Sequence, residues 1–350
     1  MSRFIQDRES FSLAVVIPNR NDSKYLPQCI RSIVSQEVKP DELILIDDES
    51  TDNSVEVIRG EIEGHSFARL ELNPKNLGGV RTADLGLRMA RSKFVFFLGA
   101  NDLILPGHFA RVKACLNRFP HAGLWSAMVW LMDEQDRYLH MHPSPVVALR
   151  DAYFPPEACR QMVLSLGNWL TGQTTVYRRE ALLEAGGFDP ALKALNDLLA
   201  ALVVASRYGA AFSPVPVGVM RVHQGAFLPE TLQNTELLDQ ILGDVKTRGP
   251  KVEPALFTPK MLERTELRFY FASLRLSEGA TLEHIKKEQG WIRGLALAAT
   301  ARVPRALKGV RVALFFAIMR PYDIVSTIWY RIIGAGLVLL GEVLRGRIPR

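Results

Sequence analysis

Acidic, amide and basic side chains follow three apolar segments in the first third of the chain. They are Asn19, Arg20, Asn21, Asp47, Asp48, Asn101 and Asp102. Oxygens of this kind can accept a proton, ligate a hard cation or hydrogen-bond a nucleotide. For any one of these residues a loop cap or turn former is an equally good interpretation, because Asn and Asp favour both. Because these residues recur at the same place, directly after apolar segments, we favour a role in catalysis or ligand binding over a purely structural one.

Alternating strands and helices would bring these side chains together. Buried strands are predicted at 11–18, 41–48, 67–73 and 93–98. Helices with one apolar face are predicted at 23–36, after Asp52, and at 80–90. The alternation predicts an α/β fold with a doubly wound, mostly parallel sheet and right-handed crossovers. Such sheets bind ligands at the carboxyl ends of their strands, so a nucleotide-sized site is expected there.

The second half of the chain is patterned less regularly. Strands are predicted at 122–131 and 138–144, and residues 174–188 suggest a strand, a helix and a Gly-Gly stop. A long apolar helix and a strand then span 197–223, and helical patterns dominate from 227 onward. We therefore predict a catalytic domain over 1–226 and a helical C-terminal region over 227–350.

Composition narrows the class of protein. Hydrophobic residues make up 48% of the 350 residues and charged residues 23%. These proportions are typical of a globular protein rather than a disordered one. The three cysteines are widely spaced and odd in number, so neither a disulfide framework nor a zinc knuckle is predicted. The first ten residues are charged and carry no apolar core, so the expected location is the cytoplasm.

The positive charge belongs to the end of the chain. Residues 290–350 hold ten Lys and Arg against two acids, while the whole chain carries +6, so the remainder is slightly acidic. A body of that charge argues against nucleic-acid binding. Apolar residues between Ile324 and Leu344 recur at helical spacing among arginines, in runs too short to span a bilayer. This pattern predicts an interfacial helix at the inner membrane face; the alternative is a helix that packs on the catalytic domain.

Several motifs together resemble one known family. They are "VVIPNRNDSKYLPQCIRSIVSQEVKPDELILIDDESTDNSVEVI", "NLGG", "FVFFLGANDLILP", "YRREALLEAGGFDP" and "RVHQGAF", in that order along residues 11–226. They resemble the family 2 glycosyltransferases, inverting enzymes with the GT-A fold. The resemblance implies a nucleotide-sugar donor and a glycan or lipid-linked acceptor, in the synthesis of a surface polysaccharide or glycolipid.

The resemblance also implies roles for individual residues. Pro18 and Asn19 would line the base pocket and Asp48 would hydrogen-bond the nucleobase, while for Asp47 a structural role is an equally good interpretation. The other implied donor-binding residues are Asn76, Arg81, Asn101, Asp102 and Arg221. Asp197 would be the catalytic base, and the implied metal ligands are Asp102, Asn101 and His223.

Three departures from the family pattern involve four residues. Gly99 and Asn101 stand where the acidic loop usually carries Asp, Asn196 stands where a Glu often precedes the base, and Ala83 stands where Arg is common. A neutral amide brings no charge to a cation, so we expect Mn²⁺ or Mg²⁺ to bind weakly. These departures leave open a non-catalytic relative that binds a nucleotide sugar or a partner protein. A nucleotidyltransferase is less favoured, because "PNRNDSKYL" is not a glycine-rich basic loop.

Overall fold

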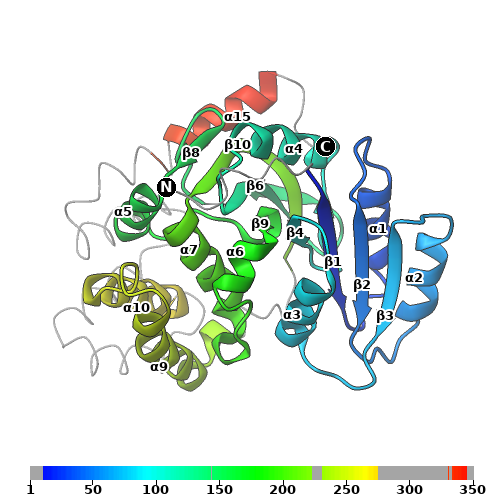
Figure 1. Cartoon of the computed structure of the whole chain (residues 1–350), viewed down its shortest axis with the longest axis horizontal. Helices are drawn as coiled ribbons and strands as arrows, with labels where there is room; N and C mark the ends of the chain where they lie inside the picture. The colour runs from blue at the N-terminus through cyan, green and yellow to red at the C-terminus, as the bar shows by residue number, and fades with distance from the viewer. Residues whose placement is uncertain (1–10, 143, 223–230, 275–329, 331–332, 345–350) are drawn as a thin grey trace.

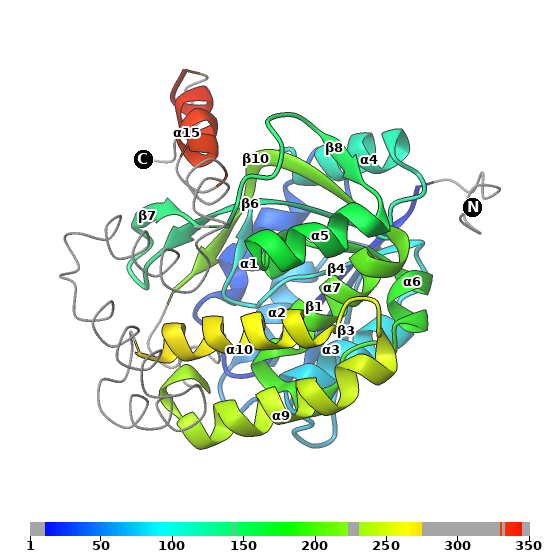
Figure 2. The same cartoon turned by 90° about the vertical axis from the view of Figure 1, so that its left-hand side faces the viewer.

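The computed structural model describes residues 11–142, 144–222, 231–274, 330 and 333–344. One twisted sheet runs through the molecule with helices on both of its faces (Figures 1 and 2). Its strands are β1 (Leu13–Asn19), β2 (Glu42–Asp47), β3 (Ala68–Leu72), β4 (Phe94–Phe97), β5 (Leu103–Ile104), β6 (Leu124–Met132), β7 (Tyr138–Met141), β8 (Ala152–Phe154), β9 (Val176–Arg178) and β10 (Ala210–Arg221).

The sheet is mixed, and its long pairings are parallel. The strand order is β3-β2-β1-β4-β9-β6-β10-β5, with β7 beside β6 and β8 beside β10. β1 pairs in parallel with β2 and β4, β2 with β3, and β6 with β10, whereas the antiparallel pairings involve only two or three residue pairs each. The predicted α/β fold with a mostly parallel sheet is therefore confirmed.

The helices are short and mostly amphipathic. They are α1 (Leu26–Val34), α2 (Ser54–Ile62), α3 (Gly79–Met89), α4 (His108–Arg118), α5 (Pro156–Leu166), α6 (Arg179–Glu184), α7 (Asn196–Tyr208), α9 (Thr235–Val252), α10 (Pro259–Leu274) and α15 (Gly334–Leu344), with 3₁₀ turns η2 (Gly172–Thr174) and η3 (Pro190–Leu195).

The apolar strands are buried because both faces of the sheet are covered. Along β1, Ala14 and Val16 belong to one core cluster and Val15 and Ile17 to another. The first cluster includes side chains of α3, α5, α7 and α9, and the second includes those of α1 and α4. Successive side chains of β1 thus enter the cores on opposite faces of the sheet. This explains why the sequence of β1 is an unbroken apolar run.

The C-terminal helices lie against the rest of the molecule. Ile241 and Val245 of α9 and Met261 of α10 belong to the same core cluster as Ala14 of β1. α15 lies apart from them, near β10 (Figures 1 and 2). The Tyr330 carbonyl accepts a hydrogen bond from the Val146 amide at 2.9 Å. The domain boundary near 226 stays a prediction.

Candidate active site

The carboxyl ends of β1 and β2 meet as neighbouring strands. Asn19 lies opposite Asp47 in the parallel register, and its side-chain amide donates to Asp47 Oδ1 at 2.7 Å. Asp47 Oδ2 accepts the Ser50 amide at 2.9 Å. Both bonds hold the loop that follows β2, so the geometry matches the structural interpretation of Asp47. Asn19 is buried, and its Oδ1 has no partner among the described residues.

Asp48 anchors the loop that leads into α3. Its carboxylate accepts the side-chain amide of Asn73 and the backbone amides of Leu77 and Gly78, each at 2.8 Å. Burial by itself would raise the pKa of Asp48, but these hydrogen bonds outweigh it and hold the pKa below its usual value. Asp48 is therefore ionised and only 2% exposed, with both oxygens engaged by the protein. Its predicted bond to a nucleobase stays a prediction.

The remaining residues predicted to bind the donor in this half lie around the same loop. Asn76 is exposed, its amide donates to Glu49 Oε2 at 3.0 Å, and its Oδ1 accepts from Gly78 at 2.9 Å. Arg81 is exposed in the first turn of α3, and Pro18 is partly buried in β1. Backbone hydrogen bonds join these segments: the Asp48 amide donates to the Asn19 carbonyl at 2.8 Å, and the Asn73 amide donates to the Asp47 carbonyl at 2.9 Å.

Asn101 and Asp102 form a second polar loop, after β4. Asp102 Oδ1 accepts the backbone amide of Arg221 at 2.8 Å. A methyl group built on Gly99 would lie 3.0 Å from Asn101 Oδ1 and 3.1 Å from Asp102 Oδ2, so both oxygens face the Gly99 backbone. Glycine at this position leaves room for them. Burial raises the pKa of Asp102 to about 7, although the Arg221 amide and charge oppose the shift.

Arg221 ties this loop to two distant segments. Its guanidinium is fully buried and lies 4.6 Å above the Tyr25 ring. Its acceptors are the carbonyl of Asn101 (3.1 Å), the carbonyl of Asp133 (2.9 Å), Asp136 Oδ1 (2.6 Å) and Gln28 Oε1 (2.8 Å). Arg221, which the family resemblance implies to bind the donor, is thus a fixed positive charge with most of its hydrogen-bond donors already used. Sequence reasoning missed Tyr25, Gln28 and Asp136.

Asp197 lies in the first turn of α7, against the η2 turn. A methyl group on Gly172 would come within 2.6 Å of Asp197 Oδ2, so Gly172 leaves the space that the carboxylate occupies. Burial raises the pKa of Asp197, and its own amide and that of Leu198 only partly offset this. The neighbouring Asn196 donates to the Lys193 carbonyl. Lys193 has a φ of 42°. This conformation is uncommon outside glycine, and such strain gathers near functional sites.

The η2 turn connects Asp197 with the loop that carries Asp102. Thr174 donates from its hydroxyl to the Ala127 carbonyl at 2.8 Å, which fastens the turn to β6. A methyl group on Gly218 of β10 would lie 3.3 Å from the Leu103 carbonyl and 3.6 Å from Thr174 Cγ2. Asp197 therefore lies against the η2 turn, and the η2 turn and Leu103, the residue after Asp102, both lie beside Gly218. No motif in the sequence marked Gly172 or Gly218 for this role.

The oxygens near Gly99 partly fit a divalent cation. Among the described residues no group of three or more His, Cys, Asp and Glu could hold a metal ion. Asp102 Oδ2 and Asn101 Oδ1 nevertheless face the same space. A cation such as Mg²⁺ often needs only one or two protein oxygens beside substrate phosphates. The third predicted ligand, His223, lies outside the described residues.

The predicted membrane helix is described only over α15. Leu337, Leu340 and Leu344 recur along it and are 45%, 54% and 78% exposed. None of the helices in the described ranges is both long and apolar enough to cross a bilayer. The arginines predicted to flank it, such as Arg331 and Arg345, fall outside those ranges.

Comparison with known proteins fits this geometry. The family model described as Glycosyl transferase family 2 matches residues 14–185. An uncharacterized protein of Mycobacterium tuberculosis is 29% identical over 218 residues, which cover 60% of this chain and 66% of that relative. The chain thus spans a little less than two thirds of that relative's length.

Two solved structures share the fold. The first is Staphylococcus aureus TarS 1–349 in complex with UDP-GlcNAc, with a TM-score of 0.56 at 16% identity, covering 97% of this chain and 93% of TarS 1–349. The second is the mannosyltransferase PcManGT of Pyrobaculum calidifontis in complex with GDP-Man and Mn²⁺, with a TM-score of 0.53 at 19% identity, covering 96% and 89%. The family model over 14–185, just under half of the chain, assigns this part of the chain to glycosyl transferase family 2.

Proposed function

We propose that this protein is an inverting glycosyltransferase that moves a sugar from a nucleotide-sugar donor to a glycan or lipid-linked acceptor. The carrying observation is Asp197, a carboxylate with a raised pKa that lies against the turn next to the Asn101–Asp102 loop. Inverting transfer needs a base to take the proton from the attacking hydroxyl, and raised basicity suits that task. Two proteins of the same fold have been solved in complex with UDP-GlcNAc and with GDP-Man, which supports a nucleotide-sugar donor.

The departing nucleoside diphosphate needs positive charge around it. Arg221 supplies a fixed cation whose position is set by Gln28, Asp136 and Tyr25, so it loses no freedom when the donor binds. Asp102 and Asn101 would hold Mn²⁺ or Mg²⁺ weakly, through one charged and one neutral oxygen. When bound, such a cation stabilises charge on the leaving oxygens as a Lewis acid.

Asp48 and its neighbours would receive the nucleoside. Asp48 fixes the loop 73–78, which includes Asn76, and the start of α3, while Pro18 and Asn19 lie at the end of the neighbouring strand β1. Arg81, exposed at the start of α3, is close enough in sequence to take the place of the family arginine absent at Ala83. In this arrangement the nucleobase binds beside β1–β3, and the diphosphate binds beside the Asn101–Asp102 loop and Arg221 of β10.

The acceptor belongs to surface polysaccharide or glycolipid synthesis, at the cytoplasmic face of a membrane. Support comes from the exposed leucines of α15 and from the basic composition of residues 290–350. The double variant Leu340→Glu, Leu344→Glu should lose binding to anionic vesicles and keep donor binding. Unchanged vesicle binding would refute the interfacial role of α15.

A panel of UDP-, GDP- and dTDP-sugars tests the main proposal, scored by binding and by slow hydrolysis with and without Mn²⁺. We expect one nucleotide to bind clearly better than the others, with hydrolysis that requires Asp197. If no nucleotide sugar binds, the proposal fails.

Gly99 and Asn101 favour a second candidate function, a relative that binds a nucleotide sugar without turning it over. These residues reduce the negative charge where the family carries acids. Tight donor binding without transfer or hydrolysis, unaffected by Asp197→Asn, would support this function over the first.

A further inference from the structure

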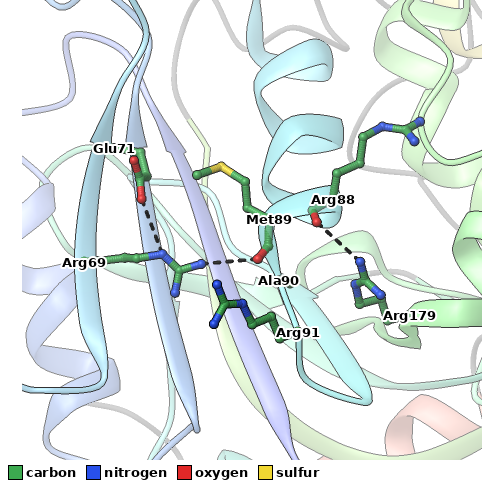
Figure 3. A pocket seen from close by; sticks show the side chains of 7 residues that line it. All are labelled: Arg69, Glu71, Arg88, Met89, Ala90, Arg91 and Arg179. Atoms are coloured by element: carbon green, nitrogen blue, oxygen red, sulfur yellow. Dashed lines mark hydrogen bonds and ion pairs between the residues drawn. The ribbon is translucent and has the colours of Figure 1, made fainter.

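Four arginines line an open hollow at the edge of the sheet opposite the candidate active site. The hollow has a volume of about 890 Å³ and is lined by Arg69, Glu71, Arg88, Met89, Ala90, Arg91 and Arg179 (Figure 3). Arg69 lies near the start of β3, Arg91 precedes β4, and Arg179 begins α6. The residues implied to bind the donor follow the opposite ends of these strands, so the hollow is separate from them.

Two of these arginines have a structural role at the end of α3. Arg179 donates to the carbonyls of Leu87 (3.1 Å) and Arg88 (3.3 Å), and Arg69 donates to the carbonyl of Met89 (3.3 Å). Such bonds satisfy the free carbonyls at a helix C-terminus. They also hold both guanidinium groups at the hollow, while Arg179 Nη1 keeps no acceptor among the described residues.

Arg91 has no comparable structural partner. Its backbone amide donates to Glu42 Oε1 at 2.9 Å, which fixes the main chain, but its exposed guanidinium has no acceptor in the described part of the chain. Figure 3 shows this guanidinium pointing into the same space as that of Arg69.

Nearby acids neutralise only part of this charge. Glu42 and Glu71 pair with Arg69, and Asp84 pairs with Arg88. Arg91 and Arg179 are left as positive charges that line the same hollow, where an anion would relieve their repulsion.

We propose that the hollow binds a phosphate-bearing anion through Arg91 and Arg179, with Arg69 as a supporting charge. A guanidinium offers planar, paired donors that match phosphate oxygens, and two such groups around one space can hold a diphosphate or a phosphodiester. The phosphate belongs to a soluble phosphorylated compound or to a lipid headgroup. α3 begins at the Asp48 loop and ends at the hollow, so donor and anion occupy opposite ends of one helix.

Calorimetry of the full chain with inorganic pyrophosphate in chelator tests the soluble source. Arg91→Glu is compared with Arg59→Glu, a matched change at an exposed arginine of α2 that does not line the hollow. Pyrophosphate at the active site contributes equally to both variants, so only their difference is scored. We expect Arg91→Glu to weaken binding at least fivefold, with the melting temperature and donor binding unchanged. Arg179→Gln should act in the same direction.

Sedimentation with vesicles tests the lipid source, using phosphatidylcholine with and without phosphatidylglycerol. Loss of pyrophosphate binding with unchanged vesicle binding supports a soluble phosphate compound. Loss of both, in Arg91→Glu but not in Arg59→Glu, supports a headgroup. If the two variants behave alike in both assays, the proposal is overturned.

Discussion

The carboxylate in the loop after β2 and those of Asp102 and Asp197 have pKa values shifted in opposite directions. Asp48 is buried but receives three hydrogen bonds from the protein, and its pKa is held below the usual value. Asp102 is buried and Asp197 is partly buried, each with fewer donors than Asp48, and their pKa values are raised. The first arrangement uses charge to build the site, while the second leaves proton or cation affinity available for chemistry.

The largest effect is expected at Asp197, on the reactive side of the comparison. Asp197→Asn should lower the transfer rate by about 10²- to 10⁴-fold, because it removes the proton acceptor and preserves the shape. Nucleotide affinity and melting temperature should change little, since Asn is tolerated near a helix start about as well as Asp. Steady-state transfer and donor titration measure both quantities.

Asp189→Asn is the matched control for this variant. Asp189 lies in the same segment and accepts the Ala191 amide at 2.9 Å as a cap of η3. Its replacement should leave the rate within a few-fold. Near-normal transfer by folded Asp197→Asn would remove Asp197 from the mechanism.

Asp102 should make stability depend on pH. Its folded pKa of about 7 lies above the unfolded value near 3.9, so the folded state binds the proton more tightly. The resulting stabilisation is complete below about pH 4 and is lost as the pH rises through 7. Asp102→Asn removes this loss, so the variant should gain up to about 4 kcal/mol over wild type between pH 4 and pH 8.

Urea unfolding in chelator at several pH values measures this difference. The Asn oxygen can still accept the Arg221 amide, so the fold around β10 should persist. Parallel stability curves for wild type and variant would contradict a raised Asp102 pKa.

Asp48→Asn should have the opposite effect on stability. The variant keeps one acceptor oxygen and places an amide donor against the amides of Leu77 or Gly78, leaving a buried donor unpaired. We expect a loss of about 2–4 kcal/mol in the free energy of unfolding at pH 7. Asp52→Asn, at an acid exposed on the same loop, is the control and should cost less. A stable Asp48→Asn protein would break the contrast between the two regions.

The smallest effect is expected at Asn101, the neutral residue among the implied metal ligands, and it concerns the affinity for Mn²⁺. Asn101→Asp adds a charged oxygen beside Asp102 Oδ2 and should tighten Mn²⁺ binding several-fold, with higher activity at low metal concentration. Titration with Mn²⁺ at pH 8, where Asp102 is ionised, measures it. Unchanged activity of wild type and variant in excess chelator would show that Arg221 alone supplies the positive charge.

The local pattern of the chain was enough to predict the elements and their polar ends. Apolar β-branched runs and helical spacing predicted β1–β4 and α1–α3 to within a few residues, and the order of motifs indicated the family. The strand-end position of Asp47, Asp48, Asn101 and Asp102 followed from the same alternation. These features depend on neighbours that are close along the chain, so a single sequence expresses them directly.

Only the tertiary structure decided which distant groups meet. Arg221 contacts Gln28 across 193 residues of sequence, Gly172 leaves room for Asp197, and Arg91 shares a hollow with Arg179 of α6. It also decided that Asp48 is saturated with hydrogen bonds while Asp102 is not, although both are acids after buried strands. The physical reason is that a pKa depends on burial and donors contributed by remote segments, and packing brings those segments together without leaving a periodic signal in the sequence.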